Sequence, residues 1–87
     1  MKTFDLTPKD RQSFNNKCKV IEDKKTCKLQ SYNTIICEYN KEDKKIYFKQ
    51  FDEKLLSNTT VRHINAFFEF YGFLPTNKAE LKEHYFS

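Results

Sequence analysis

The sequence predicts an α+β fold in which a three-stranded antiparallel sheet packs on one face against a helix, with short helices near both termini. Two patterns predict it. Residues 26–51 alternate apolar and polar side chains with a period of two, which is typical of strands, and residues 57–73 repeat apolar side chains every three or four positions, as a helix does. A sheet and a helix that each have one apolar face bury both by packing together.

The chain is short, basic and rich in aromatic residues. Its 87 residues suffice for one domain, residues 1–87, and nine Phe and five Tyr supply large buried surfaces for a small core. No run of about 18 apolar residues is present to span a bilayer. A secretory signal is not expected either, because Met1 is followed by mixed rather than apolar residues. We therefore expect a cytoplasmic protein with no membrane contact.

Residues 1–25 are expected to form a helical segment. Thr7 is a favourable N-cap, Pro8 suits the first helical position, and Asp10 lies near the positive end of the helix dipole. The predicted helix runs to about Lys17. It has few apolar residues, so we expect it to contact the rest of the protein loosely.

The sheet is predicted from three alternating runs. The first begins at Thr26, and a turn at residues 31–33 leads into the second run at residues 34–39. The wholly polar residues 40–44 then separate the second run from the third at residues 45–51, which indicates a hairpin.

Residues 57–73 form the best-marked element. Asn58 or Thr59 is the predicted N-cap, Gly72 lies where a left-handed residue ends a helix, and Pro75 stops it. The apolar stripe consists of Val61, Ile64, Phe67, Phe68 and Tyr71. This stripe is the surface that we expect to cover the sheet.

The last predicted element is a closing helix over residues 76–86. Asn77 and Glu80 match a capping box, with Thr76 as a competing N-cap. Leu81 and the tyrosine four residues later lie on one face of this helix, which we expect to pack on the core.

Two segments of the chain resemble a known family. The runs L-Q-S-Y-N-T-I-I-C at residues 29–37 and S-N-T-T-V-R-H-I-N-A-F-F at residues 57–68 are similar to a small uncharacterised family of phage and mobile-element proteins. Its members pair a serine-tyrosine-x-threonine strand with a threonine-threonine-x-arginine-histidine-isoleucine helix. The resemblance covers residues 26–82. It implies an origin in a phage or integrated element and, by association, a small effector such as an anti-CRISPR inhibitor of a defence nuclease.

No spacing of a nucleophile and a base predicts catalysis, so we expect a protein that is not an enzyme and has no cofactor. Cys18, Cys27 and Cys37 are odd in number and too widely spaced for a zinc knuckle, so we interpret them as buried free thiols. A metal site would need them to converge with His63 or His84, which the sequence does not predict.

The predicted contact surface combines the hairpin with the start of the long helix. Its aromatic and basic side chains favour surface occlusion of a host protein in a bacterial cytoplasm. Nucleic acid is the alternative partner, since the net charge is +4 and Tyr47 or Tyr32 offers a stacking platform, although twelve acidic residues interrupt the lysines. The candidate contacts are Tyr39, Lys41, Lys44, Tyr47, Lys49, Arg62 and His63. We expect a monomer or a homodimer that associates through the exposed sheet face or edge.

Arg62 and His63 have competing interpretations. Arg62 with Thr59 and Thr60 can hold a phosphate or a partner's carboxylate near the helix N-terminus. Alternatively, the threonines cap the helix and Arg62 pairs with Glu38 on the sheet. His63 is expected to be half-buried, with a hydrogen bond to the backbone of a strand.

Overall fold

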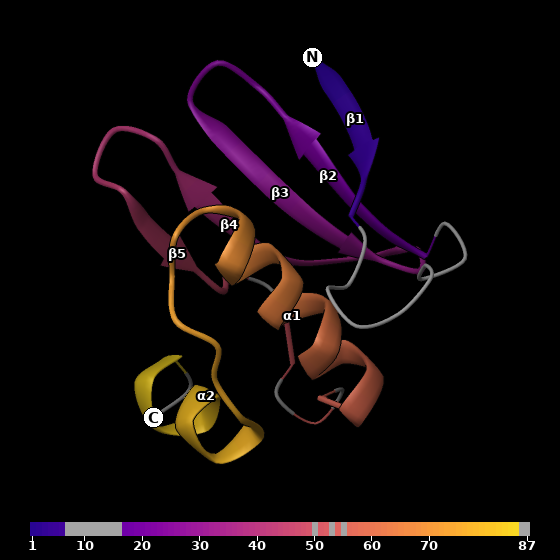
Figure 1. Ribbon diagram of the computed structural model, residues 1–87, viewed down its shortest axis with the longest axis vertical. Helices are drawn as coiled ribbons and strands as arrows, with labels where there is room; N and C mark the ends of the chain where they lie inside the picture. The colour runs from indigo at the N-terminus through magenta and orange to yellow at the C-terminus, as the bar shows by residue number, and fades with distance from the viewer. Residues whose placement is uncertain (7–16, 50, 53, 55, 86–87) are drawn as a thin grey trace.

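The computed structural model describes residues 1–6, 17–49, 51–52, 54 and 56–85. Within these residues, a five-stranded antiparallel sheet is followed by two helices (Figure 1). The strands are β1 (Lys2–Asp5), β2 (Cys18–Glu22), β3 (Thr26–Ser31), β4 (Thr34–Asn40) and β5 (Lys45–Tyr47), and the helices are α1 (Asn58–Phe70) and α2 (Lys78–Tyr85). Each strand pairs with its neighbour in sequence, so the sheet is a meander with β1 and β5 at its edges.

The predicted α+β class is confirmed, but the predicted number of three strands is wrong. The two additional strands, β1 and β2, lie in residues 1–25, which were expected to be helical. In β1 only Phe4 is apolar, so its alternation is too short to recognise, and the strand forms because it pairs with β2 along its whole length. The helix expected from Thr7 to about Lys17 falls almost wholly outside the described residues.

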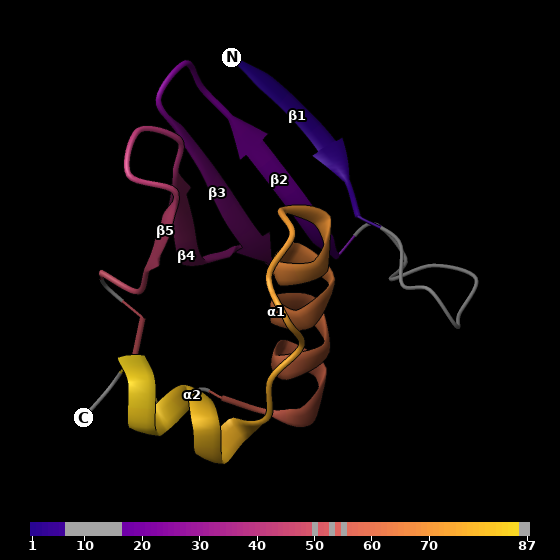
Figure 2. The same ribbon diagram turned by 60° about the vertical axis from the view of Figure 1, so that its left-hand side comes forward.

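The core lies between α1 and one face of the sheet, which we call the covered face (Figures 1 and 2). The buried apolar side chains on the strands are Cys18, Val20, Cys27, Leu29, Ile36, Cys37 and Ile46, and those on α1 are Ile64, Phe67 and Phe68. The predicted packing of the long helix on one face of the sheet is therefore confirmed.

A β-bulge interrupts the alternation of β4. Leu29 pairs with Cys37, but the next residue of β3, Gln30, pairs with Ile35, so Ile36 is an extra residue with no direct partner. As a result Ile36 and Cys37 are both buried, whereas Ile35 is exposed. The strict alternation predicted for this strand is wrong at the bulge.

Ser57 caps the N-terminus of α1. Its Oγ accepts a hydrogen bond from the Thr60 amide at 3.2 Å. The predicted caps, Asn58 and Thr59, are wrong by one and two residues. They lie in the first turn instead, so they do not supply the capping oxygen.

The predicted end of α1 at Gly72 is confirmed. Gly72 has a φ of 85°, a backbone conformation that glycine adopts without strain. Its amide donates to the Glu69 carbonyl at 3.2 Å, and the Phe73 amide donates to the Phe68 carbonyl at 2.7 Å, which together form a Schellman motif. The rings of Phe68 and Phe73 lie 5.8 Å apart, so the apolar contact typical of this motif is also present.

The capping box of α2 is confirmed, with Asn77 rather than Thr76 as the N-cap. The Glu80 amide donates to Asn77 Oδ1, and Asn77 Nδ2 donates to Glu80 Oε1, both at 2.9 Å. Before this box, Asn65 of α1 exchanges two hydrogen bonds with the backbone of Thr76. These bonds draw the connection back along α1 and leave Leu81 fully buried.

Candidate interaction surface

The side of the sheet opposite α1 is not covered by either described helix, and we call it the open face (Figure 2). Residues paired across antiparallel strands point to the same face, so the strand register identifies its members. One row crosses all five strands through Thr3, Ile21, Lys28, Glu38 and Tyr47. Another begins with Asp5, Lys19, Gln30 and Ile35.

A hollow of about 190 Å³ lies on the open face between β3, β4 and the end of β5. Ile35, which the bulge turns outward, and the ring of Tyr47 supply its apolar walls. Lys28, Glu38 and Lys49 supply its charges, and Lys49 Nζ lies 3.6 Å from Glu38 Oε2. The hollow therefore combines apolar surface with a charged pair, as protein interfaces commonly do.

The polar groups beside the hollow are held by neighbours in their own hairpin. The Tyr47 hydroxyl donates a hydrogen bond to the Asp43 carboxylate. This bond raises the pKa of Tyr47 above its ordinary value, so the phenol stays protonated at neutral pH. The Glu38 side chain is only 15% exposed and pairs with Lys49. Tyr47 consequently offers its ring rather than its hydroxyl to a partner.

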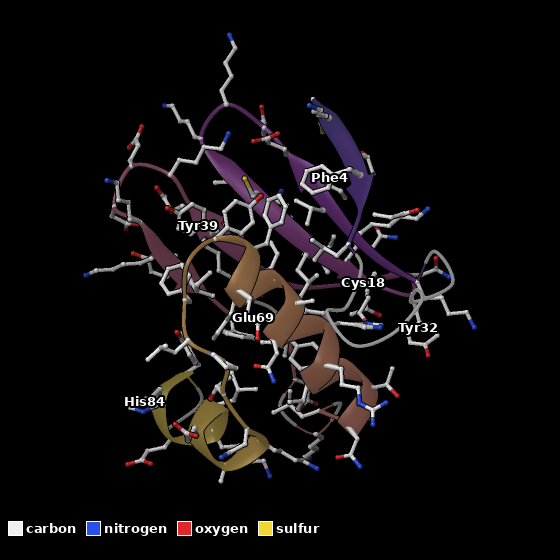
Figure 3. The ribbon with its side chains drawn as sticks, in the orientation of Figure 1. Phe4, Cys18, Tyr32, Tyr39, Glu69 and His84 are labelled. Carbon is white, nitrogen blue, oxygen red and sulfur yellow. The ribbon has the colours of Figure 1, made fainter. Side chains whose placement is uncertain are left out.

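The structure divides the aromatic and basic residues of the predicted hairpin surface. Tyr47 and Lys49 both line the hollow. Tyr39 lies on the covered face instead, where its ring stacks on Tyr71 at 4.7 Å and meets Phe73 edge-on at 5.7 Å (Figure 3). Tyr39 is thus a packing residue at the end of α1 and does not share a surface with Tyr47.

Lys41 and Lys44 belong to the loop between β4 and β5. Lys41 Nζ lies 3.1 Å from a carboxylate oxygen of Glu22, and this hydrogen bond raises the pKa of Lys41. Lys44 is exposed, has a φ of 59°, and its amide donates to the Asn40 carbonyl at 2.8 Å. Neither lysine lines the hollow, and the loop that carries them also contains Glu42 and Asp43, so its charge is mixed.

The helix-start residues differ from each other in exposure. Arg62 is exposed, and its predicted partner Glu38 pairs with Lys49 instead, because these two side chains share the open face. His63 is only 1% exposed and shares a hydrogen bond of 2.6 Å with Ser31 Oγ. The ring was expected to be half-buried, which is wrong, because it is buried. This hydrogen bond is made to a side chain of the strand rather than to its backbone. Burial lowers the pKa of His63.

Ser31 is the polar residue of this region that the sequence did not single out. It lies on β3 at the turn, 32 positions before His63 in the chain. The next residue, Tyr32, has a φ of 57°, and its ring lies 6.0 Å from that of His63 and 5.2 Å from Lys17 Nζ. The serine-tyrosine turn and the arginine-histidine helix thus meet in space. The sequence offered one signal for this contact, which is that the turn and the helix lie in the two segments that carry the family resemblance.

The three cysteines, Cys18, Cys27 and Cys37, are free and buried. Burial, with a smaller effect of Asp5, raises the pKa of Cys18 to about 12, and burial also raises that of Cys37, so both thiols stay protonated and weakly nucleophilic. Within the described part of the chain, no three His, Cys, Asp or Glu side chains gather in a group able to hold a metal ion.

A family model matches residues 4–83. The chain belongs to the family of unknown function DUF8033. The matched region includes the serine-tyrosine turn and the arginine-histidine helix. It also includes half of β1 and all of β2, which lie before the start of the resemblance at residue 26. Comparison with curated proteins and with solved structures found no match. Neither of the two described helices has the length and apolar character needed to cross a membrane.

Proposed function

We propose that this DUF8033 protein is a non-enzymatic binding protein that docks a folded protein partner on its open face. The observation that carries the proposal is the hollow, in which Ile35 and the ring of Tyr47 adjoin the Glu38–Lys49 pair. Binding hot spots are enriched in Trp, Tyr and Arg side chains, surrounded by contacts that contribute little energy but exclude water. Tyr47 is the central anchor of this surface.

The mixed charge of the open face favours a protein over a nucleic acid. Glu38 lies between Lys28, its partner on β3, and Lys49, with which it forms an ion pair. Nearer the β1 edge of the same open face, Asp5 is the register partner of Lys19. Binding to a phosphate backbone depends on positive charge that is not already paired. A protein partner with its own mixture of charges fits this pattern better.

A nucleic acid is the second candidate partner. Lys19, Lys28 and Lys45 lie on the open face by register, and Lys49 borders its hollow. A base stacked on the Tyr47 ring would bring its phosphates towards these ammonium groups. Contact with phosphates would make the affinity strongly dependent on salt.

The most specific form of the proposal concerns the source and target of the protein. The resemblance of residues 29–37 and 57–68 to phage and mobile-element proteins supports an origin in such an element and a place in the cytoplasm of a bacterial host. Small size supports action by occlusion of a host protein. On this proposal the target is a defence nuclease, such as a CRISPR effector, and the open face blocks a surface that the nuclease needs.

The test begins with capture of partners from bacterial host lysates, followed by affinity measurements on the purified partner. Tyr47→Ala and Ile35→Ser alter the hollow, and Leu74→Ser is the matched control because Leu74 is 86% exposed outside it. We expect Tyr47→Ala to cost about 2 kcal/mol, which is an affinity loss of about 30-fold. Leu74→Ser should leave the affinity unchanged. Equal affinity of wild type and both hollow variants would exclude the open face.

Two assays separate the candidate partners. If the captured protein is a nuclease, its cleavage of target DNA should stop at stoichiometric amounts of this protein and recover with Tyr47→Ala. Fluorescence anisotropy of labelled DNA and RNA at about 50 to 200 mM salt tests the second candidate. Tight binding with a steep salt dependence, lost when Lys28 and Lys45 are changed to Glu, would support the nucleic-acid function instead.

A further inference from the structure

The two edges of the sheet differ in their protection against pairing with another strand. Natural sheets protect an edge with a short strand and with lysines. The edge strand β5 has three residues, begins with Lys45 and follows Lys44, so two copies of this edge would repel each other. The other edge strand, β1, has one positive and one negative residue, and none of the described strands pairs with its outer side (Figures 1 and 2).

The hydrogen-bonding pattern shows which backbone groups point outward from β1. The Leu6 amide donates to the Cys18 carbonyl at 2.9 Å, which fixes the phase of the ladder between β1 and β2. Because inward and outward groups alternate along an antiparallel strand, Phe4 continues the inward set and Thr3 and Asp5 form the outward set. The amides and carbonyls of Thr3 and Asp5 therefore face away from β2 and are oriented so that a further strand can pair with them.

Aromatic surface borders this edge on the covered side. The rings of Phe4 on β1 and Phe70 at the end of α1 lie 5.4 Å apart, and Figure 3 shows Phe4 on the side of the sheet that carries α1. Phe70 is nevertheless 58% exposed. Since an exposed phenylalanine beside an available strand edge leaves apolar area in water, docking of a strand there would remove it.

We propose that β1 pairs antiparallel with β1 of a second copy of this chain, so that one continuous sheet runs through a homodimer. A two-fold axis perpendicular to the sheet keeps both covered faces on the same side, which brings Phe4 and Phe70 of the two copies together across the seam. Antiparallel pairing also sets the Lys2 end of each β1 against the Asp5 end of the other, whereas parallel pairing would align like charges. The open face stays available on both copies.

Sedimentation equilibrium of the full chain tests the dimer. Between about 1 µM and 1 mM, concentrations that match weak to moderate association, the mass should rise from 10.5 kDa towards twice that value. Thr3→Pro removes an outward amide and leaves the bonds to β2 intact, and Phe70→Ser removes the aromatic rim without a backbone change. Each should raise the dimer dissociation constant at least about tenfold. Ile35→Ser, an equivalent loss of exposed apolar surface on the open face, should not change it.

The outcomes that overturn the proposal are distinct from those that support it. A monomer mass at every concentration would overturn it. So would a dimer weakened by Ile35→Ser but not by Thr3→Pro or Phe70→Ser, since that would place the contact on the open face. Circular dichroism of Thr3→Pro checks that the sheet is retained, and Phe70→Ser serves as the test if it is not.

Spin labels locate the contact directly. Because the three native thiols are buried, a single introduced cysteine can be labelled selectively. In the proposed dimer, labels at Thr3→Cys lie within about 25 Å of each other, since neighbouring strands are about 4.8 Å apart and the labels add their own length. Labels at Lys45→Cys, on the opposite edge, should be farther apart. The reverse order of distances would overturn the proposal.

Discussion

The covered and open faces are formed by the same strands, but different interactions hold them. On the covered face, Val20, Leu29 and Cys37 pack against Ile64 and Phe67 of α1 with almost no exposure to water. On the open face, the ion pair of Glu38 with Lys49 lies among half-exposed side chains around the hollow. Apolar burial dominates folding energy, and exposed ion pairs add little. The covered face therefore stabilises the fold. Residues of the open face contribute little to stability, so they can be selected for binding instead.

The largest difference in stability between substitutions on the two faces is expected at Phe67. This side chain is fully buried, and its ring meets that of Tyr71 at 5.0 Å. Phe67→Ala should lower the free energy of unfolding by about 3–5 kcal/mol, because it removes buried surface and leaves a cavity. Urea denaturation followed by circular dichroism measures this loss. Ile35→Ala on the open face is the control and should cost less than about 1 kcal/mol; similar losses would contradict the comparison.

A smaller effect is expected from the buried hydrogen bond on the covered face. Ser31→Ala removes the hydroxyl that bonds to His63 Nδ1 and should cost about 1–3 kcal/mol, since a buried polar group loses this partner. Thr26→Ala removes a hydroxyl from the open side of the same strand and should change stability by less than about 0.5 kcal/mol. Both are measured by urea denaturation. Equal stability of Ser31→Ala and wild type would show that the bond contributes nothing net.

The same histidine gives a pH dependence with a defined sign. Burial lowers the pKa of His63 in the folded state, so below its ordinary value of 6.5 the unfolded state binds more protons. Stability is therefore fully present above about pH 6.5 and falls as the pH drops towards the folded-state pKa. Urea midpoints at about pH 7.5 and pH 5 should show a smaller difference in His63→Gln than in wild type. His84→Gln, which removes an exposed imidazole from α2, should retain the wild-type difference.

The smallest effect is expected from the ion pair on the open face. Lys49→Gln should lower stability by no more than about 1 kcal/mol, because Lys49 is largely exposed and solvent screens its pairing with Glu38. The loss should shrink further at high salt. Lys45→Gln, on the same hairpin, is the control for removal of a lysine. If Lys49→Gln cost as much as Ser31→Ala, the open face would have to be regarded as part of the stabilising core.

Local signals were sufficient to predict the helices. Gly72 ends α1 because its positive φ is encoded by one residue, and Asn77 with Glu80 starts α2 through bonds three residues apart. The strand β1 was missed because it has one core-facing apolar residue, Phe4, and depends on pairing with β2. The bulge at Ile36 was missed for the same reason, since it exists only in the register between two strands.

The candidate surface was predicted in part, because sequence spacing does not state which face of a sheet a helix will cover. Tyr47 and Lys49 lie together on the open face, but Tyr39 was placed with them and instead stacks on Tyr71. The bond between Ser31 and His63 joins positions 32 residues apart, a contact that no local pattern encodes. Segments with separate local signals can be predicted individually, whereas their meeting point requires the tertiary structure.

The order of elements along the chain has a consequence for synthesis in the cell. The five strands of the described residues precede α1, and each pairs with the one made just before it, so the sheet can assemble as the polypeptide emerges. Until Asn58–Phe70 has been translated, however, the apolar side of that sheet has no cover. A nascent or prematurely terminated chain that lacks α1 is consequently prone to aggregate, and the synthesis and docking of α1 end that exposure.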